Sequence, residues 1–184
     1  MQLSRSRPER REHFLNRAKV VAEMSTCLRR KVGAIIVSND GVELSSGYSG
    51  APRGSKHCTE IGRCLRTELR IPSGQNYELC RSIHAEQNAI INAARTGVSI
   101  VGGEMYISSE KIKGGYGNRD EQDKIYGPCI ICKKEIINAG LTAVHMREER
   151  VGERTYSLVQ IKEMLAQEEE KWRERSTDNA KMPP

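Results

Sequence analysis

Residues 82–97 read SIHAEQNAIINAARTG, and this stretch decides how the rest of the chain is interpreted. Its small apolar residues recur at spacings that place them on one side of an α-helix. They are Ala85, Ala89, Ile90, Ala93 and Ala94. Gly97 is suited to end this helix as a C-cap. His84 and Glu86 therefore lie at the beginning of a helix, where both can flank a small pocket.

On both sides of this helix, strand patterns alternate with helical ones. Strands are expected at 33–37, 42–48, 104–108 and 141–146, and helices at 10–30, at 128–140 and from residue 155 onward. The turn SNDG (38–41) tolerates positive φ values, so the first two strands form a hairpin. The alternation predicts an α/β sandwich with crossover connections.

Two segments, 49–81 and 109–127, lack these patterns. The first is rich in Gly, Pro and Ser, and a loop of this length is uncommon unless it is functional or held by something else. The second is a polar insertion between a strand and the next helix. Residues 1–9 are interpreted as a flexible basic arm and residues 171–184 as a disordered tail. Residues 10–170 then form one domain, which suits a chain of 184 residues.

The chain has a formal net charge of +6 and a pI of about 9.1, which suits an anionic partner such as a nucleotide phosphate or a nucleic acid. Much of the excess lies in RSRPERR (5–11). The longest apolar run, VGAIIV (32–37), is far shorter than the roughly 20 residues of a membrane span. The N-terminus also lacks the apolar segment of a secretory signal. We therefore expect a cytoplasmic, reducing location, where cysteines are thiols or metal ligands.

A second helix brings metal ligands toward the first. Cys129 and Cys132 lie at the start of PCIICKKEIINAG (128–140), where the helix dipole and free N–H groups favour thiolates. With His84 they make a three-ligand set that binds zinc tetrahedrally and leaves a fourth position for water. Glu86, which is not a ligand, can then shuttle protons between that water and a substrate.

Each half of this pattern has an ordinary explanation. PCxxC alone is common in structural zinc knuckles, and a lone His on an Ala-rich helix usually packs in the core. Together, HxE on one helix and PCxxC on the next, with a strand between them, match the pattern of zinc deaminases. The sequence therefore predicts a hydrolytic deaminase site.

The chain resembles the cytidine and deoxycytidylate deaminase superfamily, and within it the zinc-dependent dCMP deaminases, including the bacterial competence-operon type. The resemblance covers about residues 27–145, through the stretches CLRRKVGAIIV, GYSGAPRG, HCTEIGRCLR, IPSG, ELCRSIHAEQNAI and PCIICKKEIINAG. It implies a three-layer α-β-α fold with a mixed five-stranded sheet, a catalytic zinc ion and a homo-oligomer, often a hexamer.

The resemblance also implies roles for individual residues. His84, Cys129 and Cys132 hold the zinc, Glu86 is the general acid and base, and Ala85 contacts the base. The implied reaction is hydrolysis of a free cytosine nucleotide, dCMP, to dUMP and ammonia in pyrimidine nucleotide metabolism. Because many members are activated by dCTP and inhibited by dTTP, these nucleotides are the expected effectors.

Two features depart from the family pattern. The family usually has Asn in the stretch GYNG, where its amide contacts the sugar or phosphate. This chain has Ser49, whose hydroxyl group is shorter. The insertion at 109–127 is also unusual, because the strand normally runs almost directly into the PC motif. Both features bear on the substrate rather than on the chemistry.

Four further cysteines lie before His84. They are Cys27, Cys58, Cys64 and Cys80. Some dCMP deaminases hold a second, structural zinc in this region, and four thiolates would close a tetrahedral site and order the 49–81 loop. His57 is an alternative ligand, and Cys64 is the cysteine that it would replace. The other interpretation is that Cys27 and Cys80 are small buried apolar residues.

Cationic residues in or beside the matched stretches are candidates for binding a nucleotide phosphate. They are Arg29, Arg30, Arg53 and Lys56. Arg53, in the Gly-Pro turn next to Ser49, is the first choice. Taken singly, each is better explained as a solvated surface residue.

Two other functions stay open. A tRNA adenosine deaminase performs the same chemistry on a base in nucleic acid, and the basic charge permits this. However, the block HCTEIGRCLR resembles the nucleotide branch, so a nucleic acid is not the expected partner. A non-catalytic, zinc-stabilised protein of the same fold is the other alternative, and it would have no use for Glu86.

Overall fold

A five-stranded sheet forms the centre of the molecule. The computed structural model describes residues 7–72, 75–112, 127–149 and 152–179. The strands are β1 (Arg30–Val37), β2 (Glu43–Tyr48), β3 (Glu104–Lys111), β4 (Ala143–Glu148) and β5 (Gly152–Ser157), in the order β2-β1-β3-β4-β5. β3 and β4 are parallel, and the other neighbours are antiparallel. The predicted mixed five-stranded sheet is therefore confirmed.

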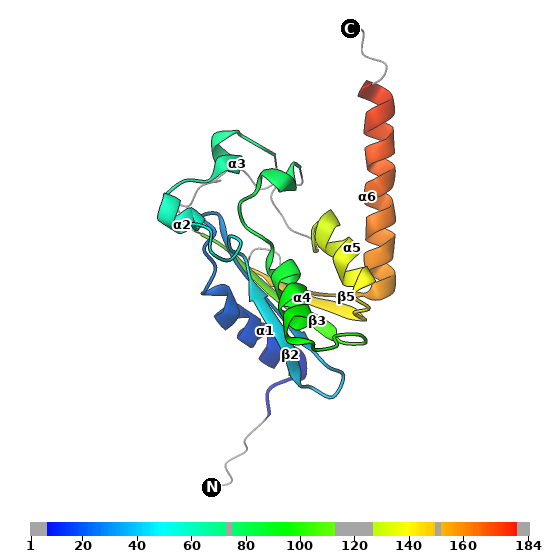
Figure 1. Cartoon of the computed structure of the whole chain (residues 1–184). Helices are drawn as coiled ribbons and strands as arrows, with labels where there is room; N and C mark the ends of the chain where they lie inside the picture. Colours follow the sequence, from blue (N-terminus) through cyan, green and yellow to red (C-terminus); the bar gives the residue numbers. More distant parts are fainter. Residues whose placement is uncertain (1–6, 73–74, 113–126, 150–151, 180–184) are drawn as a thin grey trace.

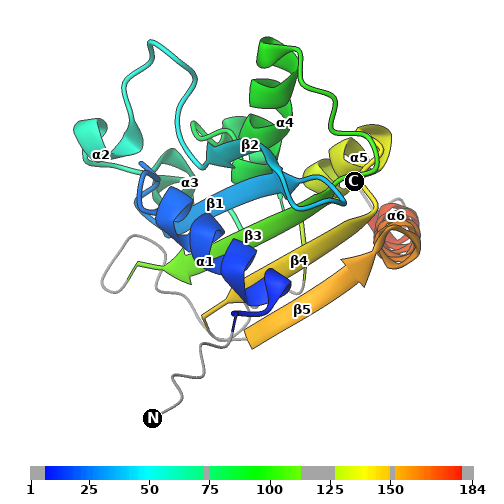
Figure 2. The same ribbon diagram turned by 90° about the horizontal axis from the view of Figure 1, so that it is seen from below.

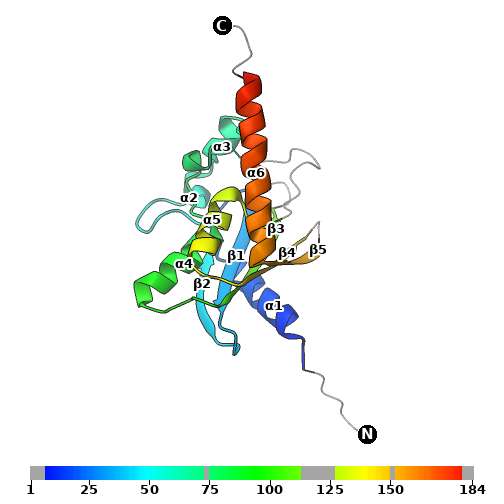
Figure 3. The same ribbon diagram turned by 90° about the vertical axis from the view of Figure 1, so that its right-hand side faces the viewer.

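Helices cover both faces of this sheet (Figure 1). Helix α1 (Arg10–Ala22) lies on one face, and α4 (Ala85–Thr96), α5 (Ile130–Asn138) and α6 (Leu158–Asn179) lie on the other, as Figures 2 and 3 show. The short helices α2 (Cys58–Ile61), α3 (Leu65–Glu68) and η1 (Tyr77–Leu79) belong to the connection between β2 and α4. The predicted three-layer arrangement is confirmed.

Successive side chains along each strand point to opposite faces of the sheet, so an apolar core forms on each face. On β3, Met105 and Ile107 join the core beneath α4 and α5, whereas Tyr106 joins the core beneath α1. Glycines let the layers approach closely. A Cβ atom on Gly47 of β2 would lie 2.3 Å from the backbone nitrogen of Ala89 in α4. The same absence of a side chain at Gly33 lets α1 pack against β1.

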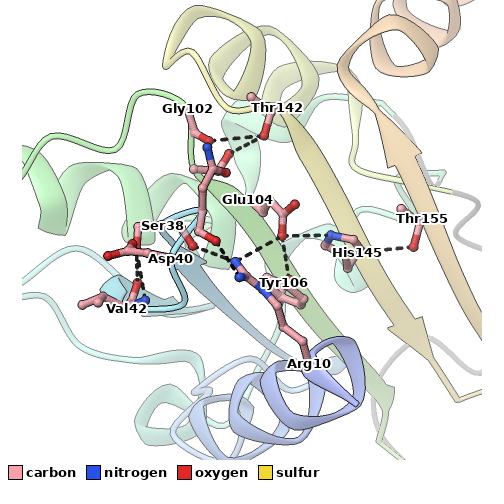
Figure 4. A network of polar contacts seen from close by, with 12 residues as sticks. Arg10, Ser38, Asp40, Val42, Gly102, Glu104, Tyr106, Thr142, His145 and Thr155 are labelled. Carbon is pink, nitrogen blue, oxygen red and sulfur yellow. Dashed lines mark hydrogen bonds and ion pairs between the residues drawn. The ribbon is translucent and has the colours of Figure 1, made fainter.

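A polar cluster on the face of the sheet that α1 covers joins this helix to the strands as far as the β5 edge (Figure 4). Glu104 Oε2 accepts a hydrogen bond from the Tyr106 hydroxyl at 2.7 Å and lies 3.7 Å from Arg10 and 3.4 Å from His145 Nε2. The rings of Tyr106 and His145 stack with centroids 4.4 Å apart, and His145 Nδ1 lies 3.0 Å from Thr155 Oγ1. This cluster therefore links α1, β3, β4 and β5.

Several element boundaries differ from the expectations. Helix α1 ends at Ala22 rather than near residue 30, because Ser25 and Thr26 hydrogen-bond to the Ser49 carbonyl and direct the chain away from the helix. Strand β3 continues to Lys111, two residues past the start of the predicted insertion at 109–127, because its backbone pairs with β1. Residues 113–126 of that insertion lie outside the described residues.

The C-terminal helix is longer than expected. Its backbone is helical through Asn179, whereas the composition predicts a disordered tail from residue 171. Glu, Lys and Arg are good helix formers, and Arg173 pairs with Glu170 one turn away, which suits a helical backbone here. Within the described residues, no helix is both long and apolar enough to cross a membrane.

Candidate metal centre and substrate cavity

The structure brings His84, Cys129 and Cys132 together at the first turns of two helices. His84 is the N-cap of α4, Cys129 is the N-cap of α5, and Cys132 lies in the first turn of α5. The two sulfur atoms lie 3.3 Å and 3.4 Å from His84 Nδ1. One ligand atom from each residue lies within 4.8 Å of the others, a spacing that suits three ligands around one ion.

The protonation chemistry of this group also fits a metal cation. A hydrogen bond from Cys132 lowers the pKa of the Cys129 thiol from 9.0 to about 4, and the same bond raises the pKa of Cys132. Burial acts to lower the pKa of His84, but the Cys129 hydrogen bond and the Glu86 charge outweigh it and raise that pKa to about 9. The surroundings of His84 therefore favour a positive charge. Two sulfur atoms and an imidazole nitrogen are also a donor set that zinc prefers.

Glu86 lies beside this group without belonging to it. Its side chain is buried, with 6% of the residue exposed, in the first turn of α4. Burial raises the pKa of its carboxyl group, and the charge of His84 partly opposes that rise. Such a carboxyl group is suited to accept and return a proton near neutral pH.

A cavity of about 490 Å³ has His84 and Cys129 of the metal-ligating group in its wall. The volume is in the range that holds a small-molecule ligand. Ser109 of β3 and Met146 of β4 line it, so it lies toward the carboxyl ends of the two parallel strands. His84, Glu86 and Cys129 all face this cavity, which therefore unites a metal site, a proton carrier and space for a substrate.

Most of the predicted substrate residues also line the cavity. They are Ser49, Ala85, Arg29 and Arg30. Ser49 is buried, and its hydroxyl shares a hydrogen bond of 2.6 Å with Ser25. Arg30 forms an ion pair with Glu148 at 3.2 Å. Arg53, the first choice for the phosphate, does not line the cavity but donates a hydrogen bond to Asn92 in α4 at 2.7 Å.

The four other cysteines occupy a different part of the same wall. Cys27, Cys58, Cys64 and Cys80 all line the cavity and carry free thiols. Among the described residues, only the His84 group meets the 4.8 Å spacing. His57 caps α2, and its Nδ1 lies 3.1 Å from Thr26 Oγ1. These cysteines are thus gathered in one region without forming a group of that spacing.

Side chains also order the long loop between β2 and α4. Arg66 is buried and donates hydrogen bonds to the carbonyl groups of Pro72 and Asn76, at 3.0 Å and 2.9 Å. Its guanidinium group lies 5.1 Å from the Tyr77 ring centroid, and Tyr77 packs edge-on against His84 at 5.3 Å. The loop is therefore joined to the metal site by direct packing.

The sequence patterns missed several cavity residues. Tyr77 and Arg66 lie in the segment interpreted as an irregular loop, and no local pattern distinguishes them. Lys133 and Glu168 also line the cavity. The sequence signal for Lys133 is its place directly after Cys132, whereas Glu168 lies on a helix that no motif connects to the site.

An α/β sandwich with a His-Cys-Cys group and a buried glutamate at its strand ends defines a zinc-binding fold of the deaminase class. The cytidine and deoxycytidylate deaminase zinc-binding region matches residues 8–148. The deoxycytidylate deaminase of Schizosaccharomyces pombe is 29% identical over 77% of this chain, and ComE operon protein 2 of Bacillus subtilis is 33% identical over 75%. A dCMP deaminase structure from the cyanophage S-TIM5 has 30% identity and a TM-score of 0.53, with 80% of this chain and 89% of that chain covered.

This chain belongs to the cytidine and deoxycytidylate deaminase family. It spans 38% of the S. pombe relative and 59% of the B. subtilis relative. The matched region is the zinc-binding region of the family. The residues His84, Cys129 and Cys132 fit a zinc ion in spacing and in donor type.

Proposed function

We propose that this protein is a zinc-dependent hydrolase that deaminates a free cytosine nucleotide, dCMP, to dUMP and ammonia. The observation that carries the proposal is the buried carboxyl group of Glu86 beside His84, Cys129 and Cys132 in a cavity of nucleotide size. The cyanophage relative was crystallised with dCMP and dUMP. The family and that relative support the choice of substrate.

Different residues of this chain have different roles in the proposed reaction. When bound, zinc acts as a Lewis acid that lowers the pKa of a coordinated water to about 7. Glu86 accepts a proton from the attacking water and passes it to N3 of the cytosine ring. It then takes the second proton from the hydroxyl group now on C4 and delivers it to the leaving amine. The bond from C4 to the amino group breaks, ammonia leaves, and oxygen remains on C4. Tyr77 packs on His84 and so holds that ligand in place.

The cavity wall supplies groups for the rest of the nucleotide. We propose that Ala85 contacts the base, that the Ser49 hydroxyl contacts the sugar or phosphate, and that Arg29 and Arg30 attract the phosphate. All four line the cavity. The side chain of Arg53 bonds to Asn92 outside this wall, so its location does not support a phosphate contact.

Ammonia release from a set of nucleotides tests the proposal. The protein is mixed in turn with cytidine, CMP, dCMP, dCTP, adenosine and AMP, and with a tRNA substrate, at low and high salt. We expect ammonia from dCMP above all. Release from tRNA that falls steeply with salt would instead support the nucleic-acid alternative. Repeating the dCMP assay with dCTP or dTTP tests the proposed effectors.

The substitution Glu86→Gln tests the proposed mechanism. We expect the variant to keep its zinc content, because Glu86 is not a ligand, and to lose at least about 100-fold in kcat, the usual range for a lost general acid or base. Zinc analysis and ammonia release measure the two quantities. A Glu86→Gln variant that still turns over dCMP would show that another group carries the proton.

We also propose a second, structural zinc held by Cys27, Cys58, Cys64 and Cys80, with His57 as an alternative ligand. Burial raises the pKa values of Cys58 and Cys80, and the charges of Cys27 and Cys64 raise them further. This electrostatic coupling supports the proposal because it requires the four thiols to be near one another. A homo-oligomer, a hexamer among the forms expected, and the cytoplasmic location stay predictions.

A further inference from the structure

The C-terminal helix contributes a wall of the substrate cavity. Met164 and Glu168 of α6 line the cavity together with Lys133 of α5. Figure 1 shows α6 running alongside α5 and continuing beyond it. Because Lys133 comes directly after Cys132, this wall adjoins the metal-ligating group.

Lys133 is a buried cation in this wall. Its side chain is 2% exposed, and its Nζ donates a hydrogen bond to Glu168 Oε1 at 2.5 Å. A buried ammonium group needs such a partner. The Glu168 side chain is 36% exposed, so the pair is only partly buried. Solvent screens such a pair and it adds little stability, yet loss of Glu168 leaves the buried ammonium group uncompensated. The pair is therefore poorly explained by stability alone.

The pair lies on the part of α6 that follows its last apolar contacts with the core. Ile161 is fully buried, and Met164 packs partly against the same core. Farther along the helix, Glu168 is paired with Lys133, and its neighbour Glu169 lies 3.8 Å from Lys134 in an exposed pair. Two ion pairs thus join the same helices, but one lines the cavity and the other faces solvent.

We propose that the Lys133–Glu168 pair is a positioning device that holds α6 against the cavity and thereby sets the affinity for the nucleotide. Since Glu168 compensates the charge of Lys133, the pair joins α5 to α6 in the cavity wall and offers the nucleotide no unpaired cation. Without the pair, the α6 wall at Met164 and Glu168 moves away and water enters. This inference rests on the proposed function, because it assigns the pair to nucleotide binding in the same cavity.

A double-mutant cycle tests the inference. The variants are Lys133→Met, Glu168→Leu and the combination of both. Each single variant should raise KM for dCMP, and Kd for dUMP measured by calorimetry, at least tenfold, which corresponds to about 1.4 kcal/mol. Values of kcat and zinc content should stay near those of the wild type. The combined variant should recover most of the lost affinity, because two apolar side chains can pack where the ion pair was.

The exposed pair provides a matched control. Lys134→Met with Glu169→Leu removes an ion pair between the same helices, and it should leave KM and Kd unchanged. If Lys133→Met does not fold, Glu168→Gln carries the same expectation of raised KM with unchanged kcat, because it removes the charge and keeps the shape.

Two results would overturn the inference. Unchanged affinity in the single variants would show that the pair does not shape the cavity. A combined variant as weak as Lys133→Met would show that the ammonium group contacts the nucleotide directly. Failure of the proposed function is a separate result, since a folded, zinc-loaded wild type would then release no ammonia from dCMP.

Discussion

Two histidines illustrate how burial and neighbours act at the scale of single residues. His84 and His145 both lie near a carboxylate, and burial acts to lower the pKa of each. At His84 the Cys129 hydrogen bond and the Glu86 charge prevail, and the pKa rises to about 9. At His145 burial prevails over Glu104, helped by the charges of Arg11 and Arg10, and the pKa falls below 6.5. His84 thus faces the sulfur atoms of the candidate metal centre. His145 instead packs against Tyr106 and Glu104 in a cluster that joins strands.

The lowered pKa of His145 predicts an acid-sensitive contribution to stability. The folded protein binds a proton at His145 less readily than the unfolded chain does. The stability that this residue contributes is therefore complete above pH 6.5 and is lost as the pH falls through 6.5 toward the lower folded value. His145→Phe should keep the stacking on Tyr106 and reduce the fall in unfolding free energy between pH 7.5 and pH 5.5. Urea unfolding of the wild type and the variant at both pH values measures this change in unfolding free energy.

The exposed His13 provides the comparison for this experiment. His13→Gln should keep the wild-type dependence on pH. If His145→Phe also kept it, the stacked ring would have no part in the acid sensitivity.

Residue types and spacing predicted the candidate metal group, because HxE and PCxxC are local patterns whose chemistry is specific. Lys133 and Glu168 could not be predicted in this way, since their pairing arises from the packing of α5 against α6. Arg53 shows the opposite case: its position in the chain suggested a phosphate contact, but its side chain lies against Asn92. Sequence proximity to a motif does not determine the direction of a long side chain.

At the scale of elements, the contact between β2 and α4 positions the helix that carries Glu86. Gly47 lies against the α4 backbone, so a methyl group there must displace the helix that carries His84 and Glu86. We expect Gly47→Ala to lower the free energy of unfolding by about 1–3 kcal/mol, the usual cost of overpacking. It should also lower zinc occupancy, since α4 and α5 would no longer present their ligands together. Denaturant unfolding and metal analysis test both effects.

Gly54→Ala is a suitable control for this prediction. A Cβ at Gly54 meets nothing within 4 Å, although its φ of +78° is unfavourable for alanine. It should cost about 1 kcal/mol and leave zinc occupancy unchanged. Equal zinc occupancy in both variants would contradict the role assigned to the β2–α4 contact.

The strongly patterned elements could be predicted from sequence, whereas β5 could not. The residues GERTYS lack regular apolar alternation, because this edge strand is largely exposed and its charged residues protect an open edge. The family resemblance supplied a fifth strand that the pattern did not locate. The early end of α1 was missed for a related reason, since the bonds that redirect the chain come from Ser49, distant in sequence.

At the scale of the whole molecule, one cavity connects the two proposed metal sites. His84, Cys129 and the four further cysteines all line its wall. We expect two zinc ions per chain, with Cys64→Ser and Cys129→Ser each losing one. A strong chelator should lower Tm by ~10 °C, because bound metal stabilises the folded state by several kcal/mol. Elemental analysis with thermal unfolding measures both.

One zinc ion in the wild type, unchanged in Cys64→Ser, would contradict the second site and leave the first intact. An unchanged Tm after complete metal removal would show that packing alone holds α4 and α5. The loop contacts of Arg66 with Pro72 and Asn76 are independent of metal, so some order between β2 and α4 should survive chelation.

The separation of the metal ligands along the chain has a consequence for biosynthesis. Cys129 follows His84 by 45 residues, with β3 between them, and Glu168 comes later still. At about 5–20 residues per second, a ribosome takes roughly 2–9 s to add the second ligand after the first. During that interval Glu86 has been made, but neither Cys129 nor Cys132 is present to complete the three-ligand group. The three-ligand group is thus complete only after Cys132 has been translated, and the part of the cavity wall that α6 supplies follows later still.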